Sequence, residues 1–376
     1  MIIERRQALA GLIATSLPWP LEAARLTDPK AYAAVALQLA ARSVERAPDR
    51  AAARAQMLKM IEEVGVKLRS SAIFIQQYGG SPVKLAVLPE YLLTSYPGRI
   101  SIAEFAAKAA LEVDGPEYDA FGKIAAAQKL FIAGNAYEVD KHFPGLYFQT
   151  SFVVSPSGEV VLRYRRLNSM FAPTPHDVLS KYLDIYGLDG VFPVARTEIG
   201  NLAAIASEEI VYPEIARAHA LRGAEIFLHS SSEIGSPTDT HKAIAKRARA
   251  FENLAYVISA NTAGIEGTTM PLASADGNSM VVDWKGNVLA ESNAGETFTA
   301  FADIDLAGLR AARRKPGMTN YLARQRTALF AAAYGAAKGQ AADGLIDGNQ
   351  VRIPDRDYFL RVQEQTIERL AKDGLI

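Results

Sequence analysis

The hydrophobic and polar positions of the chain follow two alternating periods from about residue 31 to residue 305. Residues 49–72 place apolar side chains three and four positions apart, which predicts a helix with one buried stripe. Residues 238–254 predict a second helix, and the apolar runs between the helices have the length and composition of strands. The predicted stripe comprises Met57, Met60, Ile61, Val64 and Leu68. The predicted strands and hairpins occupy 31–41, 83–89, 130–139, 146–168, 255–264, 277–292 and 296–305.

Residues 202–233 combine both periods, because they predict a strand, a tight turn, a helix and a second strand. Ser207 lies at the turn, where the first of these strands ends. Residues 170–195 are interrupted by proline and glycine and predict a long loop. Strands that alternate with helices and hairpins are typical of a layered α/β sandwich. Because no linker-like composition interrupts residues 31–305, we expect them to form one domain.

The two ends of the chain depart from this pattern. Residues 306–376 predict a largely helical tail with proline and glycine breaks. Residues 1–30 predict an N-terminal extension in which Arg5 and Arg6 precede a short apolar run, as in a twin-arginine export signal. The alternative for this extension is an amphipathic helix. We expect a cytoplasmic protein. The alternative is the periplasm, which the export signal would imply. No apolar run is long enough to predict a membrane span.

Charge and composition exclude several classes of protein. The chain has 41 basic and 41 acidic residues, whereas a nucleic-acid-binding protein normally carries a basic surplus. The absence of cysteine excludes disulfides, thiolate metal sites and a cysteine nucleophile. The five histidines form no HExxH or HxH pattern, and neither a Walker A motif nor GxGxxG occurs. We expect no metal, no cofactor and no nucleic-acid partner.

Three polar residues stand at the ends of predicted strands, where α/β proteins usually build their sites. Glu90 lies in LPEYLL, Arg166 ends YRR, and Ser207 begins SEEIVYPEIAR. The order and context of these motifs resemble the nitrilase superfamily of carbon–nitrogen hydrolases. The later stretches RARAFENLAYVISANTAG and GNSMVVDWKGNVLAES are similar to the closing strands of that family. The resemblance covers about residues 31–305.

The resemblance implies a four-layer α-β-β-α sandwich whose site contains a glutamate base, a lysine that stabilises the tetrahedral intermediate and a cysteine nucleophile. Carried over motif by motif, Glu90 occupies the glutamate position, Arg166 the lysine position and Ser207 the cysteine position. The resemblance further implies a small amide, carbamoyl or nitrile substrate and no cofactor. It also implies a homodimer or a larger homo-oligomer, formed through helices outside the sandwich, such as those of residues 306–376.

The two replaced side chains change the chemistry that can be expected. A thiol has a pKa near ~8.5, whereas a serine hydroxyl is a far weaker acid and needs a stronger base. Arg166 can stabilise an oxyanion but cannot give up a proton near neutral pH, and it can clamp Glu90 as an ion pair. His229, at the end of the strand EIFLHSS, is a possible substitute base for Ser207. The alternative is that His229 is an ordinary hydrogen-bonded residue at a strand end.

Two acidic residues are further accessory candidates. Asp177, in the predicted long loop, is in a position for the additional acid that some family members have. Glu208 and Glu209 follow Ser207 directly, and acids in the first turn of a helix stabilise its amino terminus. We interpret one of these two as a helix-start acid and keep Glu209 as a possible accessory site residue.

Two hypotheses of different class follow. In the first, the protein hydrolyses a non-peptide carbon–nitrogen bond through an acyl-enzyme on Ser207. Ser207 is then either a natural variant or an engineered replacement of cysteine, although the second explanation does not account for Arg166. In the second, the protein is a catalytically inactive pseudoenzyme that binds ligands or assembles with a partner.

Overall fold

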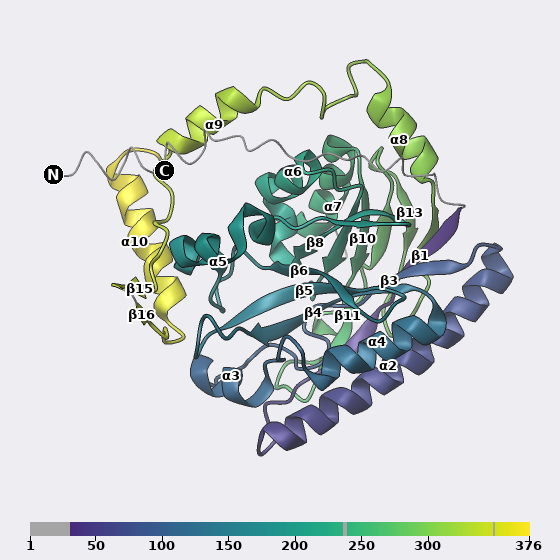
Figure 1. The fold of residues 1–376 in the computed structure, drawn as a ribbon, viewed down its shortest axis with the longest axis horizontal. Coiled ribbons are helices and arrows are strands. Elements are labelled where there is room, and N and C mark those ends of the chain that lie inside the picture. Colours follow the sequence, from purple (N-terminus) through teal and green to yellow (C-terminus); the bar gives the residue numbers. More distant parts are fainter. Residues whose placement is uncertain (1–30, 236–238, 349) are drawn as a thin grey trace.

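The computed structural model of this chain describes residues 31–235, 239–348 and 350–376. The N-terminal extension at residues 1–30, for which the sequence leaves an export signal or an amphipathic helix open, lies outside the described residues. Two six-stranded sheets form the centre of the molecule, and helices cover the outer face of each (Figure 1). This is the predicted α-β-β-α sandwich.

The first sheet has the strand order β14-β1-β3-β4-β5-β6 and the second β13-β12-β10-β9-β8-β7. In the first sheet, β1, β3 and β4 are parallel, and β6 runs in the same direction because β5 is antiparallel to both β4 and β6. In the second sheet, β8, β9 and β10 are parallel. The strands of the first sheet are β1 (Tyr32–Ala36), β3 (Val83–Val87), β4 (Phe131–Val139), β5 (Tyr147–Val154), β6 (Val160–Arg165) and β14 (Phe301–Ile304). Those of the second are β7 (Ala195–Thr197), β8 (Gly200–Ala206), β9 (Ile226–Ser230), β10 (Tyr256–Ala260), β12 (Met280–Val282) and β13 (Val288–Glu291).

Both faces of the first sheet are buried, and the alternation of side chains along each strand assigns them to two cores. Ala33 and Val35 of β1 pack in the core beneath the helices, whereas Tyr32 and Ala34 face the second sheet. Successive strand residues point to opposite faces, which explains this division. The Tyr32 hydroxyl donates to the Ile199 carbonyl of the facing layer at 2.6 Å.

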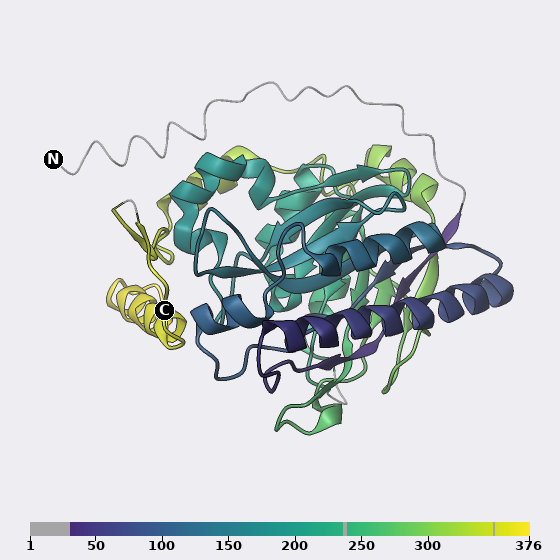
Figure 2. The same cartoon turned by 60° about the horizontal axis from the view of Figure 1, so that its bottom comes forward.

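The long helix α2 (Arg50–Gly79) covers the first sheet and confirms the helix predicted at 49–72 (Figure 2). Asp49 caps its amino terminus by accepting a hydrogen bond from the Ala52 amide. Gly80, with φ of 83°, ends it in the left-handed conformation that glycine adopts without strain. The whole predicted stripe is buried in the core beneath this helix: Met57, Met60, Ile61, Val64 and Leu68.

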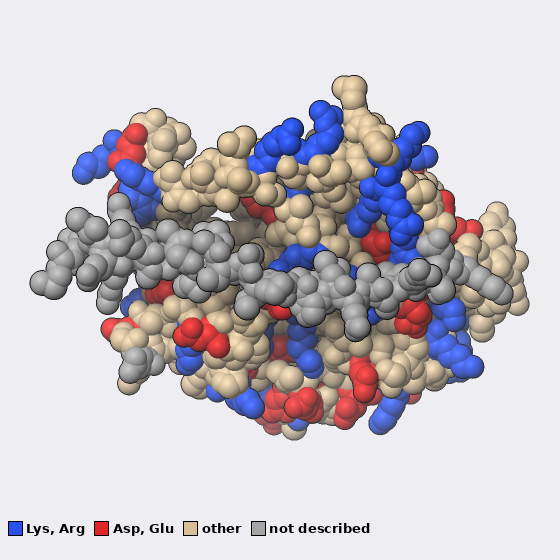
Figure 3. Space-filling view, turned by 45° about the horizontal axis from the view of Figure 1, so that its top comes forward, with Lys and Arg blue, Asp and Glu red and all other residues tan. Residues whose placement is uncertain are grey.

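The other helices complete the outer layers. On the side of the first sheet these are α3 (Ile102–Ala109) and α4 (Pro116–Gln128). On the side of the second sheet lie α6 (Pro213–Leu221), α7 (His241–Asn253) and α8 (Leu306–Arg314) (Figure 1). The visible face in Figure 3 carries basic and acidic side chains together, in keeping with the equal numbers of the two charges.

Three predicted elements are wrong in detail. The strand predicted at 255–264 is two strands, because β10 ends at Ala260 in the second sheet and the next strand pairs outside that sheet. The strand predicted at 31–41 is two strands, because the chain leaves the first sheet after β1 and β2 (Leu39–Arg42) pairs with β11 (Thr262–Glu266). The region 170–195, predicted as a loop, contains the 3₁₀ helix η1 (Pro175–Val178) and α5 (Leu179–Val191). The prolines and glycines there led to the prediction of a loop. In the structure, Pro175 occupies the first position of η1, and Gly187 (φ 61°, ψ −174°) kinks α5.

The segment after α8 lies against the sandwich at one end (Figure 1). It contains α9 (Thr327–Ala336), the short hairpin β15 (Ile346–Asp347) and β16 (Gln350–Val351), and α10 (Tyr358–Lys372). Leu345 and Phe359 are buried in the core of the first sheet, and the Leu345 amide donates to the Asp177 carbonyl at 2.9 Å. No helix within the described ranges is both long and apolar enough to cross a bilayer.

Candidate active site

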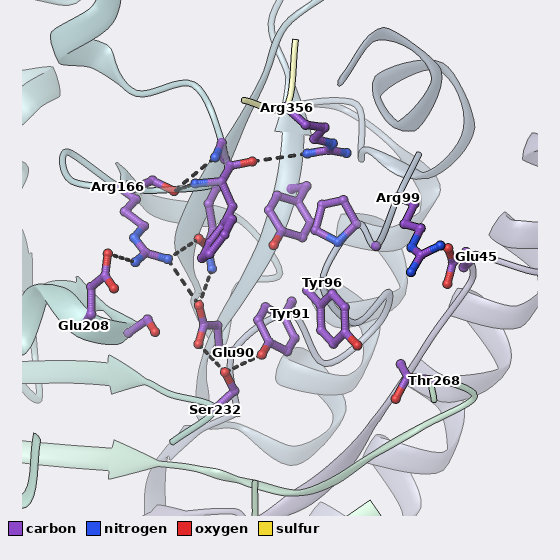
Figure 4. A pocket seen from close by; sticks show the side chains of 18 of the residues that line it. Glu45, Glu90, Tyr91, Tyr96, Arg99, Arg166, Glu208, Ser232, Thr268 and Arg356 are labelled. Carbon is purple, nitrogen blue, oxygen red and sulfur yellow. Dashed lines mark hydrogen bonds and ion pairs between the residues drawn. The ribbon is translucent and has the colours of Figure 1, made fainter. Parts of the chain in front are cut away.

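A cavity of about 1030 Å³ opens where strand ends of the two sheets meet. Its wall includes Glu90, Arg166 and Ser207, the three residues that the sequence motifs singled out. Figure 4 labels Glu90 and Arg166 in this wall. The segment just before α10 contributes as well, because Arg356 and Asp357 also line the cavity. Residues far apart in the sequence therefore share one hollow.

The direction of the strands brings these residues together. Glu90 follows β3 and Arg166 follows β6, two strands that run in the same direction in the first sheet. Ser207 follows β8 of the second sheet. The two sheets are joined at this edge by the Glu90 amide, which donates to the Ser231 carbonyl at 3.3 Å, and by the Ser230 hydroxyl, which donates to the Leu88 carbonyl at 2.8 Å.

Glu90 is buried, with 2% of its surface exposed, and both of its carboxylate oxygens have partners. Oε1 accepts from the Gln149 side-chain amide at 2.7 Å and lies 3.4 Å from Arg166 Nη1. Oε2 accepts from the Ser232 hydroxyl at 2.7 Å, and the Tyr91 hydroxyl donates in turn to Ser232 (Figure 4). This carboxylate is therefore held in one position by a network of donors.

Each guanidinium nitrogen of Arg166 likewise has a hydrogen-bond or ion-pair partner. Its Nε donates to the Asn168 carbonyl at 2.6 Å, its Nη1 donates to Gln149 Oε1 at 2.7 Å, and its Nη2 lies 2.6 Å from Glu208 Oε1. Burial alone would lower the pKa of Arg166, but the carboxylates of Glu90, Glu208 and Glu209 raise it. In Figure 4 the guanidinium lies between Glu90 and Glu208, so the clamp predicted from the sequence is present.

Ser207 stands in an unusual backbone conformation. It begins the 3₁₀ helix η2 (Ser207–Val211) directly after β8, and its φ of 50° lies in the left-handed region. Such a conformation costs roughly 1–3 kcal/mol for a residue with a Cβ and persists only where its surroundings enforce it. Strained corners between a strand and a helix are known to present nucleophiles to a pocket.

His229 is one of the groups that enforce this corner. Its Nε2 lies 2.8 Å from the Ser207 carbonyl oxygen and its Nδ1 lies 2.8 Å from the Ser259 hydroxyl. Burial, together with the charge of Lys246, holds the pKa of His229 well below its ordinary value. The imidazole is therefore neutral, and because a carbonyl can only accept, Nε2 carries the proton while Nδ1 accepts from Ser259. Both nitrogens are occupied, so His229 holds the backbone of Ser207 and has no free nitrogen for its hydroxyl.

Glu209 is a second group that holds the corner. Its carboxylate accepts from the Leu167 amide at 2.6 Å, the Asn168 amide at 3.0 Å and the Tyr164 hydroxyl at 2.8 Å. It also accepts from the amide of Ala206, the last residue of β8, at 3.3 Å. Burial raises the pKa of Glu209 to about 7, although Arg166 and these donors favour the charged form.

The structure adds one residue that the sequence patterns did not single out. Lys242, in the first turn of α7, donates from Nζ to Ser207 Oγ at 3.2 Å and to Ser231 Oγ at 3.4 Å. The helix itself was predicted, but nothing in its periodicity marks one lysine among the basic residues of HKAIAKRARA. Only the packing of α7 against η2 brings this amine to the serine.

Asp177 is placed elsewhere. Its carboxylate accepts from both the amide and the hydroxyl of Thr174 at 2.9 and 2.8 Å, which caps η1, and the residue does not line the cavity. Burial raises its pKa. In the part of the chain that the structure describes, no group of three or more acidic or histidine side chains is arranged to hold a metal ion.

Comparisons with known proteins agree with this architecture. The profile of the family described as carbon–nitrogen hydrolase matches residues 33–314. A formamidase of Bradyrhizobium diazoefficiens is 26% identical over 266 residues, which are 70% of this chain and 71% of that protein. A formamidase of Bacillus cereus is 26% identical over 259 residues, covering 68% of this chain and 70% of that protein.

Solved structures show the same fold at lower identity. Nit3 of Saccharomyces cerevisiae, described as a member of branch 10 of the nitrilase superfamily, superposes with a TM-score of 0.59 and 18% identity, covering 78% of this chain and 96% of that one. A carbon–nitrogen hydrolase of Helicobacter pylori superposes with a TM-score of 0.57 and 22% identity, covering 81% of this chain and 98% of that one.

Proposed function

Because the chain belongs to the carbon–nitrogen hydrolase family, we propose that it hydrolyses the carbon–nitrogen bond of a small amide through an acyl-enzyme on Ser207. One observation carries this proposal: Glu90, Arg166 and Ser207, which lie on three separate strand ends, line one cavity. A buried carboxylate, a guanidinium and a hydroxyl at such a junction are the groups that acyl transfer requires.

In this proposal Ser207 attacks the carbonyl carbon of the amide, and the strained corner presents its hydroxyl to the substrate. The Arg166 guanidinium supplies positive charge to the wall where the oxyanion develops. Glu90 forms an ion pair with Arg166 and orients the polar groups that donate to its carboxylate, because both carboxylate oxygens already accept from donors. The ion pairs of Arg166 with Glu90 and Glu208 fix its guanidinium in place.

The size of the cavity bears on the substrate. The two formamidases named above act on a substrate of three heavy atoms, whereas a cavity of about 1030 Å³ has room for a far larger molecule. Tyr91, Tyr96 and Tyr137 contribute aromatic surface to its wall. We therefore expect an amide larger than formamide to be the better substrate.

Ammonia release from a series of amides, from formamide to aromatic and branched amides, tests the proposal. We expect turnover by the native chain and a fall of about 10³-fold or more in kcat/KM for Ser207→Ala. Ser157→Ala, at the exposed turn between β5 and β6, is the matched control and should behave as the native chain. Unchanged ammonia release in Ser207→Ala would refute the role of Ser207.

A native chain that binds amides but turns over no amide, ester or nitrile would instead support the pseudoenzyme hypothesis. That hypothesis is motivated by serine and arginine standing where the family resemblance implies cysteine and lysine.

Association into a homo-oligomer is part of the same proposal. Helix α9 has no buried residue and exposes apolar side chains, including Leu329 and Phe330. Its Tyr334 hydroxyl donates to Glu214 of α6 at 2.7 Å, so α9 lies beside α6. Light scattering coupled to size exclusion measures the oligomer, and a monomer at micromolar concentration would contradict the expectation.

A further inference from the structure

A serine nucleophile needs a base, and the two bases suggested by the sequence are already committed. Both oxygens of Glu90 accept hydrogen bonds or pair with Arg166, and both nitrogens of His229 are used on Ser207 and Ser259. Arg166 stays protonated near neutral pH and has a partner at every guanidinium nitrogen. None of the three contacts the Ser207 hydroxyl, so the proton of that hydroxyl must go elsewhere.

Lys242 is the titratable group that does contact this hydroxyl. Its Nζ lies 3.2 Å from Ser207 Oγ, within the distance at which a base takes a proton directly. Within the described ranges no carboxylate lies at ion-pair distance from Lys242, and the other contact of Nζ is with the neutral Ser231 hydroxyl. The side chain is half-buried, so the amine is neither fully solvated nor neutralised by an acid.

We propose that Lys242 is the catalytic base for Ser207. As Oγ forms its bond to the carbonyl carbon, its proton passes to the neutral Nζ and the carbonyl electrons move to the oxygen. When the intermediate collapses, the carbon–nitrogen bond breaks and the proton passes from Nζ to the departing nitrogen. Water then attacks the acyl group and gives a proton to Nζ, and the proton returns to Oγ as the ester bond breaks. The lysine is restored at the end of the cycle, so no further reactant is needed.

Nζ and Oγ lie 3.2 Å apart, so either group can donate in this contact. An ammonium donates to Oγ, whereas a neutral amine accepts from the hydroxyl across the same distance. Lysine serves as a base in proteins when its surroundings allow the neutral form. This inference rests on the proposed function only in treating Ser207 as the nucleophile.

Titratable groups from several elements surround Lys242. Lys246 lies one turn further along α7 and pairs with Glu233 at 3.0 Å. Burial lowers the pKa of Lys246, Glu233 opposes this change, and the charge of Lys242 adds to it. His229 on β9 is neutral, and across the cavity Arg166 is balanced by Glu90 and Glu208.

Acylation of Ser207 by p-nitrophenyl acetate tests the inference without any amide turnover. The release of nitrophenolate is followed, and peptide mass spectrometry locates the acetyl group on Ser207. We expect Lys242→Met to lower the acylation rate by about 10²–10⁴-fold and to abolish its rise with pH. Lys59→Met, an exposed lysine of α2, is the matched control and should leave both unchanged.

Lys242→Arg separates a base from a charge. Arginine keeps the positive charge but cannot accept a proton, so we expect it to lose as much activity as methionine does. An arginine variant with the native rate would overturn the inference, because it would show that Lys242 acts only by its charge. A methionine variant with the native rate and pH profile would overturn it as well.

Ser207→Cys provides an independent test. A thiol ionises far more readily than a hydroxyl, so Lys242→Met should cost at least about tenfold less in the cysteine background than in the serine background. Equal losses in the two backgrounds would contradict the role of Lys242 in removing the hydroxyl proton. If no amide is hydrolysed but Ser207 is acylated in a Lys242-dependent manner, the proposed function fails while this inference stands.

Discussion

The Glu90 side of the cavity and the Ser207 side differ in how their polar groups are satisfied. On the first side, Glu90, Arg166 and Gln149 form a closed network in which each charged atom has a partner. On the second side, the Lys242 amine is the titratable group that the described residues bring within hydrogen-bond distance of the Ser207 hydroxyl, and the backbone of Ser207 is strained. A saturated network fixes geometry, whereas an unsaturated pair can still transfer a proton. We therefore expect the Glu90 side to orient the substrate and the Ser207 side to carry out the proton transfer and the attack.

Among the four predictions that test this comparison, breaking the saturated side should have the largest effect. Glu90→Gln removes one of the two carboxylates that balance Arg166 and disturbs the donors held by Glu90. We expect kcat for amide hydrolysis to fall by about 10²–10³-fold, because groups that position and balance transition-state charge are worth that much. Glu45→Gln, which changes a carboxylate of the same cavity that has no contact with Arg166, is the control and should change kcat by less than about twofold. A Glu90→Gln enzyme with native kcat would mean that the network has no catalytic role.

The second prediction concerns the support beneath the Ser207 corner. The pKa of Glu209 is about 7 in the folded protein and 4.5 for the free side chain, so the folded state holds the proton more tightly. The contribution of this proton to stability is complete below pH 4.5 and is lost as pH rises to about 7. Relative to Glu209→Gln, the native chain should therefore lose up to about 3 kcal/mol of unfolding free energy across this window.

Urea unfolding of both proteins at a series of pH values measures this difference. Glu364→Gln, an exposed side chain of α10, should show no such dependence relative to the native chain. A native chain whose stability follows that of Glu209→Gln at every pH would show that Arg166 and the donors cancel the effect of burial on the pKa of Glu209.

The third prediction exchanges the chemistry of both sides at once. Ser207→Cys with Arg166→Lys restores the thiol and amine that the family resemblance implies. We expect ammonia release from simple amides to rise by about tenfold over the native chain, because the thiol needs a weaker base. Each single variant serves as the control for the pair. A double variant that stays folded but releases no ammonia would argue against an amidase pocket of the family type.

The smallest expected effect lies at the far wall of the cavity. Arg356 donates to the Ile100 carbonyl at 2.6 Å, the Tyr147 hydroxyl at 2.9 Å and the Phe171 carbonyl at 3.2 Å, which ties the C-terminal segment to the sandwich. Arg356→Ala should raise KM about three- to tenfold with little change in kcat, since the wall moves but the two reacting sides do not. Arg361→Ala, whose ion pair with Asp355 is exposed, is the control and should leave KM unchanged. A fall in kcat larger than the rise in KM would show that this wall reaches the reacting groups.

Much of the fold could be predicted because local patterns and packing agree. The stripe of α2 is apolar at helical spacing and is buried along its whole length. The region 170–195 failed because Pro175 and Gly187 resemble loop residues, whereas here Pro175 starts a 3₁₀ helix and Gly187 kinks a helix. The strand at 31–41 failed because hydrophobicity cannot show that the chain changes sheets after Ala36.

The sequence by itself determined the strand ends that carry Glu90, Arg166 and Ser207, because each motif is local and each strand stops at a recognisable residue. It also indicated the family, since the quoted motifs occur in order and extend over most of the domain. Only the tertiary structure decided what surrounds the serine. His229 turned out to hold the Ser207 backbone, and Lys242, from a helix that begins 34 residues after Ser207, reaches its hydroxyl. Such contacts depend on how layers pack, and the period of a helix or strand carries no information about which side chain of another layer it meets.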